Sequence, residues 1–274
     1  MISFPYAKIN LGLNVVERRH DGYHNIESVF LPIALTDVLE IVPARGSHTT
    51  LTCYGNHVDC PPENNLVLKA YRLMKEHFGL PPVDIYLYKN IPHGGGLGGG
   101  SSDAAHTLLL LRTIFDLDAD DKQLTAMATR LGADCAFFIH HRPMLVTGIG
   151  DVLTPIDVPL GGKTLLLVKP EASVSTPEAY AHITPSRPIE PLPAIIASPI
   201  ELWDGRLKND FEPSVFARLP LLWRIKIALL EAGAQYAAMS GTGSTIFGIF
   251  DDANVAELAR DNFSDHSTYV IPLK

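Results

Sequence analysis

The pattern of apolar and polar positions divides the chain into short strands and amphipathic helices. Residues 83–88 alternate apolar and polar side chains, as a half-buried strand does. Residues 65–78 instead place apolar side chains such as Leu66, Leu73 and Phe78 at helical spacing, and Gly79 is a helix-ending signal. Further strands are predicted at residues 7–16, 37–42, 164–168, 245–250 and 268–271, and residues 145–151 are predicted to be a strand that runs into a turn. Further helices are predicted at residues 220–232 and 253–262, at 103–115 after a cap at Ser102 or Asp103, and at 122–130 after a cap at Asp121.

Helices and strands are mixed in both halves without the regular alternation of a doubly wound sheet, which predicts an α+β fold. A chain of 274 residues can hold two medium-sized domains. The pattern of predicted elements changes near Pro155, from a strand-rich first half to a mixed second half. We therefore predict a first domain over residues 1–155 and a second over residues 156–274. Residues 184–199 are proline-rich and are predicted to form a loop.

Composition narrows the possible partners. The formal net charge is -8, and no basic cluster follows the short Arg18-Arg19 pair, which argues against a nucleic-acid partner. Three cysteines without a paired spacing argue against a disulfide framework or a zinc site. The N-terminal residues do not resemble a signal peptide, and no apolar run is long enough for a membrane span. We therefore expect a cytoplasmic protein without a membrane segment, either a monomer or a homodimer.

A glycine-rich segment follows the predicted strand at residues 83–88 and precedes a predicted helix. This segment, called the glycine loop here, comprises Pro92, His93, Gly94, Gly95, Gly96, Leu97, Gly98, Gly99, Gly100, Ser101 and Ser102. A loop between a strand and a helix can surround an anion with backbone N–H groups, and glycine allows the backbone to approach phosphate oxygens. A tight connection between two elements rarely needs six glycines among seven positions.

Three known phosphate-binding motifs compete for this loop. Gly94, Gly96 and Gly99 match the spacing of a dinucleotide fingerprint, but no second strand ending in an acidic residue follows. A P-loop requires a Gly-Lys-Ser/Thr sequence after the glycines, which is missing. A protein-kinase loop would be accompanied by His-Arg-Asp and Asp-Phe-Gly elements, and neither occurs.

The remaining pattern, Pro-x-Gly-x-Gly-Leu-Gly followed by Ser-Ser, resembles the second motif of the GHMP kinase superfamily. Other blocks resemble that superfamily in the matching order, at residues 7–11, 21–24, 131–134, 209–212 and 240–244. The resemblance implies a first domain like domain 2 of ribosomal protein S5, a ferredoxin-like second domain, and the use of ATP with Mg²⁺. The extra glycines before the serines make this motif similar to that of one branch of the superfamily. That branch phosphorylates the 2-hydroxyl of a cytidine diphosphate-linked methylerythritol, in the non-mevalonate route to isoprenoid precursors.

The resemblance also implies site residues. Lys8 and Asp134 fall at the catalytic positions, and Asn65 and Leu66 join the glycine loop as the ATP-binding segment. The substrate-binding positions are Asn10, Tyr23, His24, Phe30, Thr176 and Tyr180. Several of these have a structural alternative: Asp134 and Asn65 as helix caps, Lys8 as a solvated strand residue, and Phe30 as part of the core. The magnesium ligand stays unassigned, because the two inserted glycines obscure which serine corresponds to the family's metal contact.

Three rival functions remain open at this point. Another GHMP kinase, acting on homoserine or mevalonate, would not need the aromatic residues Tyr23, His24 and Tyr180. An S5-like fold also occurs in RNA-binding modules, although the net charge of -8 argues against one. A dinucleotide-dependent oxidoreductase is weakened by the missing acidic strand end.

Overall fold

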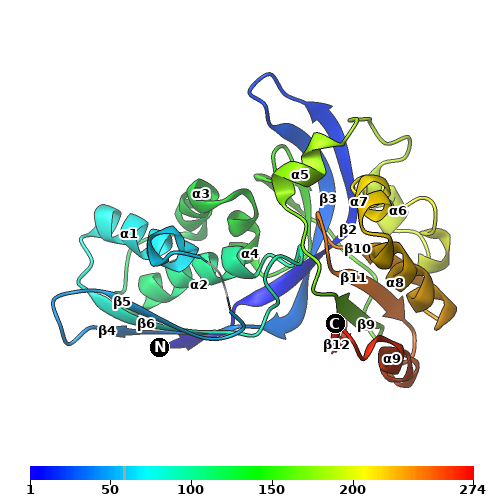
Figure 1. Cartoon of the computed structure of the whole chain (residues 1–274). Helices are drawn as coiled ribbons and strands as arrows, with labels where there is room; N and C mark the ends of the chain where they lie inside the picture. Colours follow the sequence, from blue (N-terminus) through cyan, green and yellow to red (C-terminus); the bar gives the residue numbers. More distant parts are fainter. Residues whose placement is uncertain (58–59) are drawn as a thin grey trace. The chain divides into compact units, whose positions relative to one another are not determined.

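The computed structural model describes residues 1–57 and 60–274, which pack into two compact units (Figure 1). The first unit comprises residues 1–7, 35–93 and 98–141, and the second comprises residues 8–34, 94–97 and 142–274. The units therefore do not follow a single cut in the chain, and the division at residue 155 stays a prediction about the family domains. The glycine loop itself changes unit after His93 and again after Leu97.

The first unit is built on a four-stranded sheet. Its order is β1 (Ile2–Ser3), β4 (Val38–Pro43), β6 (Val83–Lys89) and β5 (Thr50–Gly55), with only β5 and β6 running parallel. Val83, Ile85 and Leu87 of β6 are buried, and the residues between them are more exposed, which confirms the predicted alternation. Figure 1 shows helices α1 to α4 on one face of this sheet, so the buried side of β6 meets the helical layer.

The helices of the first unit confirm some predicted ends and correct others. Helix α1 (Leu66–Phe78) begins after Asn65, whose side chain accepts a hydrogen bond from the Val67 N–H at 2.9 Å, and it ends at Gly79 in a left-handed conformation. Helix α3 (Asp121–Leu131) is capped by Asp120 rather than by Asp121, because Asp120 forms a reciprocal capping box with Gln123. Apart from α2, the other helical elements of this unit are η1 (Pro62–Asn64), η2 (Ala133–Ala136) and α4 (Phe137–His140).

Helix α2 (Gly99–Ile114) begins earlier than predicted. Its N-cap is Gly98, with φ of 73°, so neither Ser102 nor Asp103 caps it. A glycine in the left-handed region turns the chain from the loop directly into the helix without a side-chain cap. Ser102 and Asp103 instead lie buried within the helix.

The second unit contains two antiparallel sheets. One has the order β2 (Tyr6–Arg18), β3 (His24–Thr36), β7 (Met144–Thr147) and β8 (Val152–Pro155), and the other has the order β10 (Tyr236–Met239), β11 (Ile246–Phe250), β9 (Thr164–Lys169) and β12 (Ser267–Pro272). In the second sheet, helices follow β9 and β11, and β9 lies between β11 and β12. This strand order is ferredoxin-like, as predicted.

The helices of the second unit are α5 (Thr176–Ala181), α6 (Leu192–Ile196), α7 (Glu212–Arg218), α8 (Pro220–Glu231) and α9 (Ala253–Arg260), with the short turns η3 (Ile200–Leu202) and η4 (Asp261–Phe263). The short helix α6 corrects the prediction of an irregular loop over residues 184–199. Leu192, Ile195 and Ile196 of α6 are buried, so packing of these apolar side chains stabilises a helix that begins directly at prolines. Residues of β2 and β3 share one apolar core with β9 and α8, which is why residues 8–34 belong to this unit.

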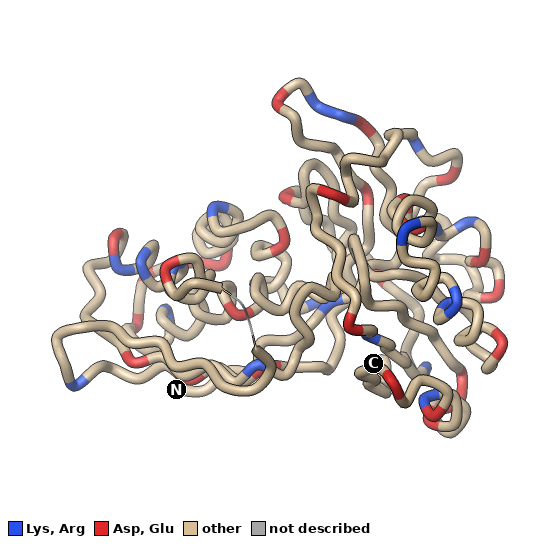
Figure 2. The backbone as a smooth tube through the Cα atoms, in the orientation of Figure 1, with Lys and Arg blue, Asp and Glu red and all other residues tan. Residues whose placement is uncertain are grey.

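Charged residues of both signs are interspersed along both units, and a short basic stretch lies at the end of β2, at Arg18 and Arg19 (Figure 2). Among the described residues, none of the helices has both the length and the apolar character needed to cross a bilayer.

A buried histidine in α2 generates a prediction about stability. His106 is 8% exposed, Ser3 Oγ lies 2.7 Å from its Nδ1, and burial together with nearby His141 lowers its pKa from 6.5 to about 4. Below pH 6.5 the unfolded chain therefore binds a proton that the folded chain rejects. We expect the free energy of unfolding to fall toward pH 4 by up to about 1.4 kcal/mol per pH unit from this group.

Denaturant unfolding at pH 7 and pH 5 measures this loss, and His106→Asn is the matched variant because its amide can still pair with Ser3. An equal acid-induced loss in the variant would contradict the assignment to His106.

Candidate active site

The first turn of α2 presents backbone N–H groups at the end of the glycine loop. The Ser102 N–H donates to the Gly98 carbonyl at 2.9 Å, so the preceding N–H groups of the turn lie before the first intrahelical bond. A Cβ on Gly99 would lie 3.0 Å from Ile91 Cγ2, so the backbone packs tightly against β6 and its following residues at this position. The turn therefore has the geometry of an anion site, with the positive end of the helix dipole behind it.

The predicted adenine-side residues lie beside this turn. Leu66 Cδ1 is 3.9 Å from the position that a Cβ on Gly100 would occupy. Asn65 caps α1, so its structural alternative is confirmed. The cap does not exclude a role in ligand binding, since it uses only the side-chain oxygen.

Asp134 lies in η2, and this short element packs against α2. Gly132 precedes η2, and no side chain caps it, so the interpretation of Asp134 as a helix cap is wrong. The neighbouring Cys135 is buried, which raises the pKa of its thiol to about 11, and its thiol pairs with the Ser101 side chain. The first unit therefore brings the predicted catalytic aspartate segment against the helix that begins the anion site.

Lys8 lies on β2 in the second unit, where it contacts another part of the glycine loop. Its N–H donates to the Leu97 carbonyl at 2.9 Å, and its Nζ donates to Asn10 Oδ1 at 2.6 Å. The ammonium also lies over the Phe30 ring, 4.6 Å from the ring centroid. Only 3% of Lys8 is exposed, so it is not a solvated strand residue. Phe30 is buried, as the core alternative predicted, and it lies under the lysine.

Asn10 connects Lys8 to Ser28 and Ser240, of which only Ser240 belongs to a family-like block of the sequence. The Asn10 side chain donates to Ser28 Oγ at 2.9 Å, and its N–H donates to Ser240 Oγ at 3.3 Å. Ser240 Oγ in turn donates to the Gly96 carbonyl at 2.9 Å. Ser28 gave no sequence signal because it lies in the unpredicted strand β3, where Pro32 interrupts the apolar run.

The glycine turn at residues 240–244 is held by Asn209. Its side-chain amide donates to the carbonyls of Met239 and Gly241, each at 2.8 Å. The carboxylate of Glu212 accepts from the Met239 N–H at 2.8 Å. The family-like residues 209–212 therefore position the turn on which Gly96 rests.

Gly95 occupies a narrow space between two side chains of the second unit. A Cβ on Gly95 would lie 2.5 Å from Thr245 Oγ1 and 3.2 Å from Lys169 Cδ. The Lys169 ammonium donates to the carbonyls of Pro170 at 2.6 Å and Ala172 at 3.1 Å, and burial lowers its pKa. Close contacts on both sides fix this part of the loop.

Two of the predicted substrate residues stack on each other. The rings of His24 and Tyr180 lie 4.9 Å apart with 26° between their planes, and the edge of Tyr180 packs against Phe211. Tyr23, which follows the Asp-Gly turn, is 62% exposed, and Thr176 is the exposed first residue of α5. Burial lowers the pKa of His24, with the charge of Arg18 adding to the effect. A neutral imidazole offers one donor and one acceptor nitrogen.

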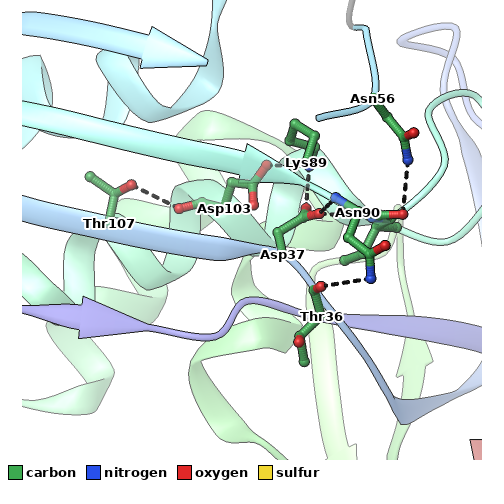
Figure 3. Close-up of polar contacts among 8 residues, drawn as sticks. Thr36, Asp37, Asn56, Lys89, Asn90, Asp103 and Thr107 are labelled. Carbon is green, nitrogen blue, oxygen red and sulfur yellow. Dashed lines mark hydrogen bonds and ion pairs between the residues drawn. The ribbon is translucent and has the colours of Figure 1, made fainter. Parts of the chain in front are cut away.

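Asp37, Lys89 and Asp103 form a buried ion cluster (Figure 3), and a Cβ on Gly99 of the glycine loop would lie 3.4 Å from Lys89 Nζ. Lys89 Nζ pairs with Asp37 Oδ2, and it donates to Asp103 Oδ2 at 2.5 Å. Burial raises the pKa of Asp103, with Lys89 opposing the rise and Asp37 adding to it. The sequence gave no signal for this cluster, because its members come from separate segments: the connection between β3 and β4, strand β6 and helix α2.

The sequence is also similar to known proteins. Two family models match the chain. The model described as "GHMP kinases N terminal domain" matches residues 65–142, and the model described as "GHMP kinases C terminal" matches residues 192–267. A relative from Parabacteroides distasonis, named 4-diphosphocytidyl-2-C-methyl-D-erythritol kinase, is 51% identical and covers 92% of each chain. The chain belongs to the GHMP kinase family. It is therefore an ATP-dependent kinase that acts on a small molecule.

Further relatives carry the same name. One from Bacteroides fragilis is 51% identical over 91% of this chain and 92% of its own. A solved structure titled "4-(cytidine 5'-diphospho)-2C-methyl-D-erythritol kinase" superposes with a TM-score of 0.84 at 33% identity, covering 99% of this chain and 98% of the other.

Each unit of this kinase holds part of the predicted site. The first unit brings Asn65, Leu66 and the segment of Asp134 to α2, and the second brings Lys8, Asn10 and Phe30 to the loop residues 96–97. Lys8 and Asp134 belong to different units, so their pairing stays a prediction.

Proposed function

We propose that this kinase transfers the γ-phosphoryl group of MgATP to the 2-hydroxyl of 4-diphosphocytidyl-2-C-methyl-D-erythritol, a step of the non-mevalonate route to isoprenoid precursors. The observation that carries the proposal is near-full-length identity to kinases named for this substrate. The stacked pair of His24 and Tyr180 supports it, because a cytosine ring requires aromatic contacts that homoserine and mevalonate do not. We place the enzyme in the cytoplasm, as a monomer or homodimer.

We assign the ATP phosphates to the glycine loop. Phosphoryl transfer depends on positioning and on electrostatic stabilisation of the transferring group more than on covalent chemistry. The first turn of α2 supplies N–H donors for that purpose, and the glycines keep side chains away from the phosphate oxygens. Asn65 and Leu66 would then contact the adenosine side of the nucleotide.

Magnesium enters this proposal as the partner of ATP, whose phosphate charge it would neutralise. Among the described residues, no group of three or more His, Cys, Asp and Glu side chains could hold a metal ion by itself. The two candidate serines differ in their contacts. Ser101 pairs with Cys135, whereas Ser102 Oγ is buried with no hydrogen-bond partner among the described residues. A hydroxyl oxygen fits a hard cation, so Ser102 is the side chain that we propose as a ligand.

At the acceptor, we propose that the oxygen of the 2-hydroxyl bonds to the γ-phosphorus while Asp134 takes the proton of this hydroxyl. The bond between this phosphorus and the β–γ bridging oxygen breaks, and ADP leaves. Lys8, already oriented by Asn10 and the Phe30 ring, would hold its charge near the reacting oxygens.

For the cytosine, we propose a site formed by Tyr23, His24 and Tyr180, with Thr176 at its edge. The Phe211 contact supports Tyr180 from the side, so its ring orientation is fixed before the base arrives. Neutral His24 can present both a donor and an acceptor to a base edge that carries both. Asn10 would be a polar contact to the substrate in addition to orienting Lys8.

ADP release with MgATP tests the substrate assignment. We expect turnover with the cytidine substrate and none above background with mevalonate, homoserine or galactose. Activity restricted to one of those three compounds would contradict the proposal and favour another GHMP kinase.

Asp134→Asn should lower kcat by about 10²–10⁴-fold, the usual contribution of a positioned acid or base. Binding of a non-hydrolysable ATP analogue should stay nearly unchanged, because the carboxylate acts on the acceptor. Asp118→Asn is the control, since Asp118 is an exposed acid of the same unit. Near-normal turnover of Asp134→Asn would remove the catalytic assignment.

Tyr180→Leu should raise KM for the cytidine substrate by about tenfold or more, because a stacked base loses roughly 1–3 kcal/mol per aromatic contact. KM for ATP should not change. Tyr54→Leu provides the matched control, because Tyr54 is an exposed tyrosine on β5 of the other unit. If Tyr180→Leu and Tyr23→Ala both leave the substrate KM unaltered, the aromatic site is wrong.

A further inference from the structure

The ion cluster of Asp37, Lys89 and Asp103 joins the two chain segments that flank the glycine loop. Lys89 is the last residue of β6, three positions before Pro92, and Asp103 comes directly after Ser102. The bond between Lys89 Nζ and Asp103 Oδ2 therefore spans the base of the whole loop (Figure 3). Both side chains are almost completely buried.

Asp37 fixes the segment that enters the loop. Its Oδ1 accepts from the Asn90 N–H at 2.6 Å and from the Ile91 N–H at 2.8 Å, while its Oδ2 pairs with Lys89. Asn56 Nδ2 also donates to the Asn90 carbonyl at 2.9 Å. The backbone just before the loop is thus held from two sides.

The segment that leaves the loop is held by the same cluster. Gly99 lies against it, since a Cβ there would be 3.4 Å from Lys89 Nζ and 3.0 Å from Ile91 Cγ2. The first turn of α2, with its N–H donors, is therefore packed directly on the residues that Asp37 and Lys89 position.

Fold stability alone is a weak reason for such a cluster. Removing charges from water is costly, and apolar residues of similar volume often stabilise a core equally well or better. The placement of this cluster, at both ends of one loop, indicates that its role is geometric. Two carboxylates on one ammonium define the loop ends more tightly than apolar contacts, because charge-assisted hydrogen bonds are short and directional.

We propose that Asp37, Lys89 and Asp103 are positioning residues that hold the two ends of the glycine loop together and so set the affinity of the kinase for ATP. This inference rests on the proposed placement of the ATP phosphates at the loop. It does not depend on the identity of the acceptor substrate.

The central test compares the wild type with Lys89→Met/Asp103→Leu. This double variant removes the spanning bond and leaves Asp37 with its two backbone N–H partners. We expect its Kd for a non-hydrolysable ATP analogue, measured by calorimetry, to rise about tenfold or more, because small displacements of binding groups have large effects. Asp103→Asn keeps an oxygen that can accept from Lys89, so it should stay within about threefold of the wild type.

Arg112→Met is the matched control, because it removes the ion pair between Arg112 and Asp121 at the other end of α2. It should bind the analogue as the wild type does. If the double variant folds poorly, Lys89→Gln replaces it. This variant loses the charge of Lys89 but retains amide donors, and its Kd for the ATP analogue is compared with that of the wild type in the same way. KM for the cytidine substrate should change much less than KM for ATP in these variants.

Amide hydrogen exchange separates the failure of this inference from the failure of the proposed function. Protection of residues 94–102 by the ATP analogue in the wild type supports the phosphate placement, and no protection there would contradict the proposed function. If the wild type is protected and the double variant binds the analogue equally well, the positioning role is wrong. A lower Tm with unchanged ATP affinity would likewise show that the cluster only stabilises the fold.

Discussion

Close approach of the glycine loop's backbone to its neighbours is the constraint on which the rest of the structure depends. A Cβ on Gly96 would lie 2.0 Å from the Ser240 carbonyl oxygen, and one on Gly95 would lie 2.5 Å from Thr245 Oγ1. These distances leave no room for any side chain. Asn209 holds the turn that carries Ser240, and Ser240 donates to the Gly96 carbonyl, so these hydrogen bonds keep the opposing surface in place.

The two units contribute to the loop by different physical means. In the second unit, neutral hydrogen bonds among Asn10, Ser28 and Ser240 hold the loop residues beside Lys8. In the first unit, a buried ion cluster lies under the loop ends and the start of a helix. Networks of neutral hydrogen bonds orient side chains at a modest cost in desolvation free energy. Buried charges cost more free energy to remove from water and therefore need a partner of opposite charge. A kinase gains from both, because phosphoryl transfer depends on fixed positions and fixed charges.

The proposed cytosine site relies on aromatic packing rather than on charge. His24 and Tyr180 come from strand β3 and helix α5, far apart in the sequence, and they meet as stacked rings supported by Phe211. Such rings offer a large contact area with few rotatable bonds. In the proposed function, they would favour a nucleotide-linked substrate over the smaller acceptors of related kinases.

The sequence by itself determined part of the local structure and the resemblance to the family. The alternation of β6, the caps of α1 and the glycine count of the loop are short-range features, because each depends on neighbouring residues. Tertiary structure decided the start of α2, the role of Asn10, the difference between Ser101 and Ser102, and the existence of the ion cluster. Asp37 and Lys89 are 52 positions apart, and Asn10 and Ser240 are 230 apart. Contacts over such distances leave no local pattern, since they form only when packing brings separate strands together.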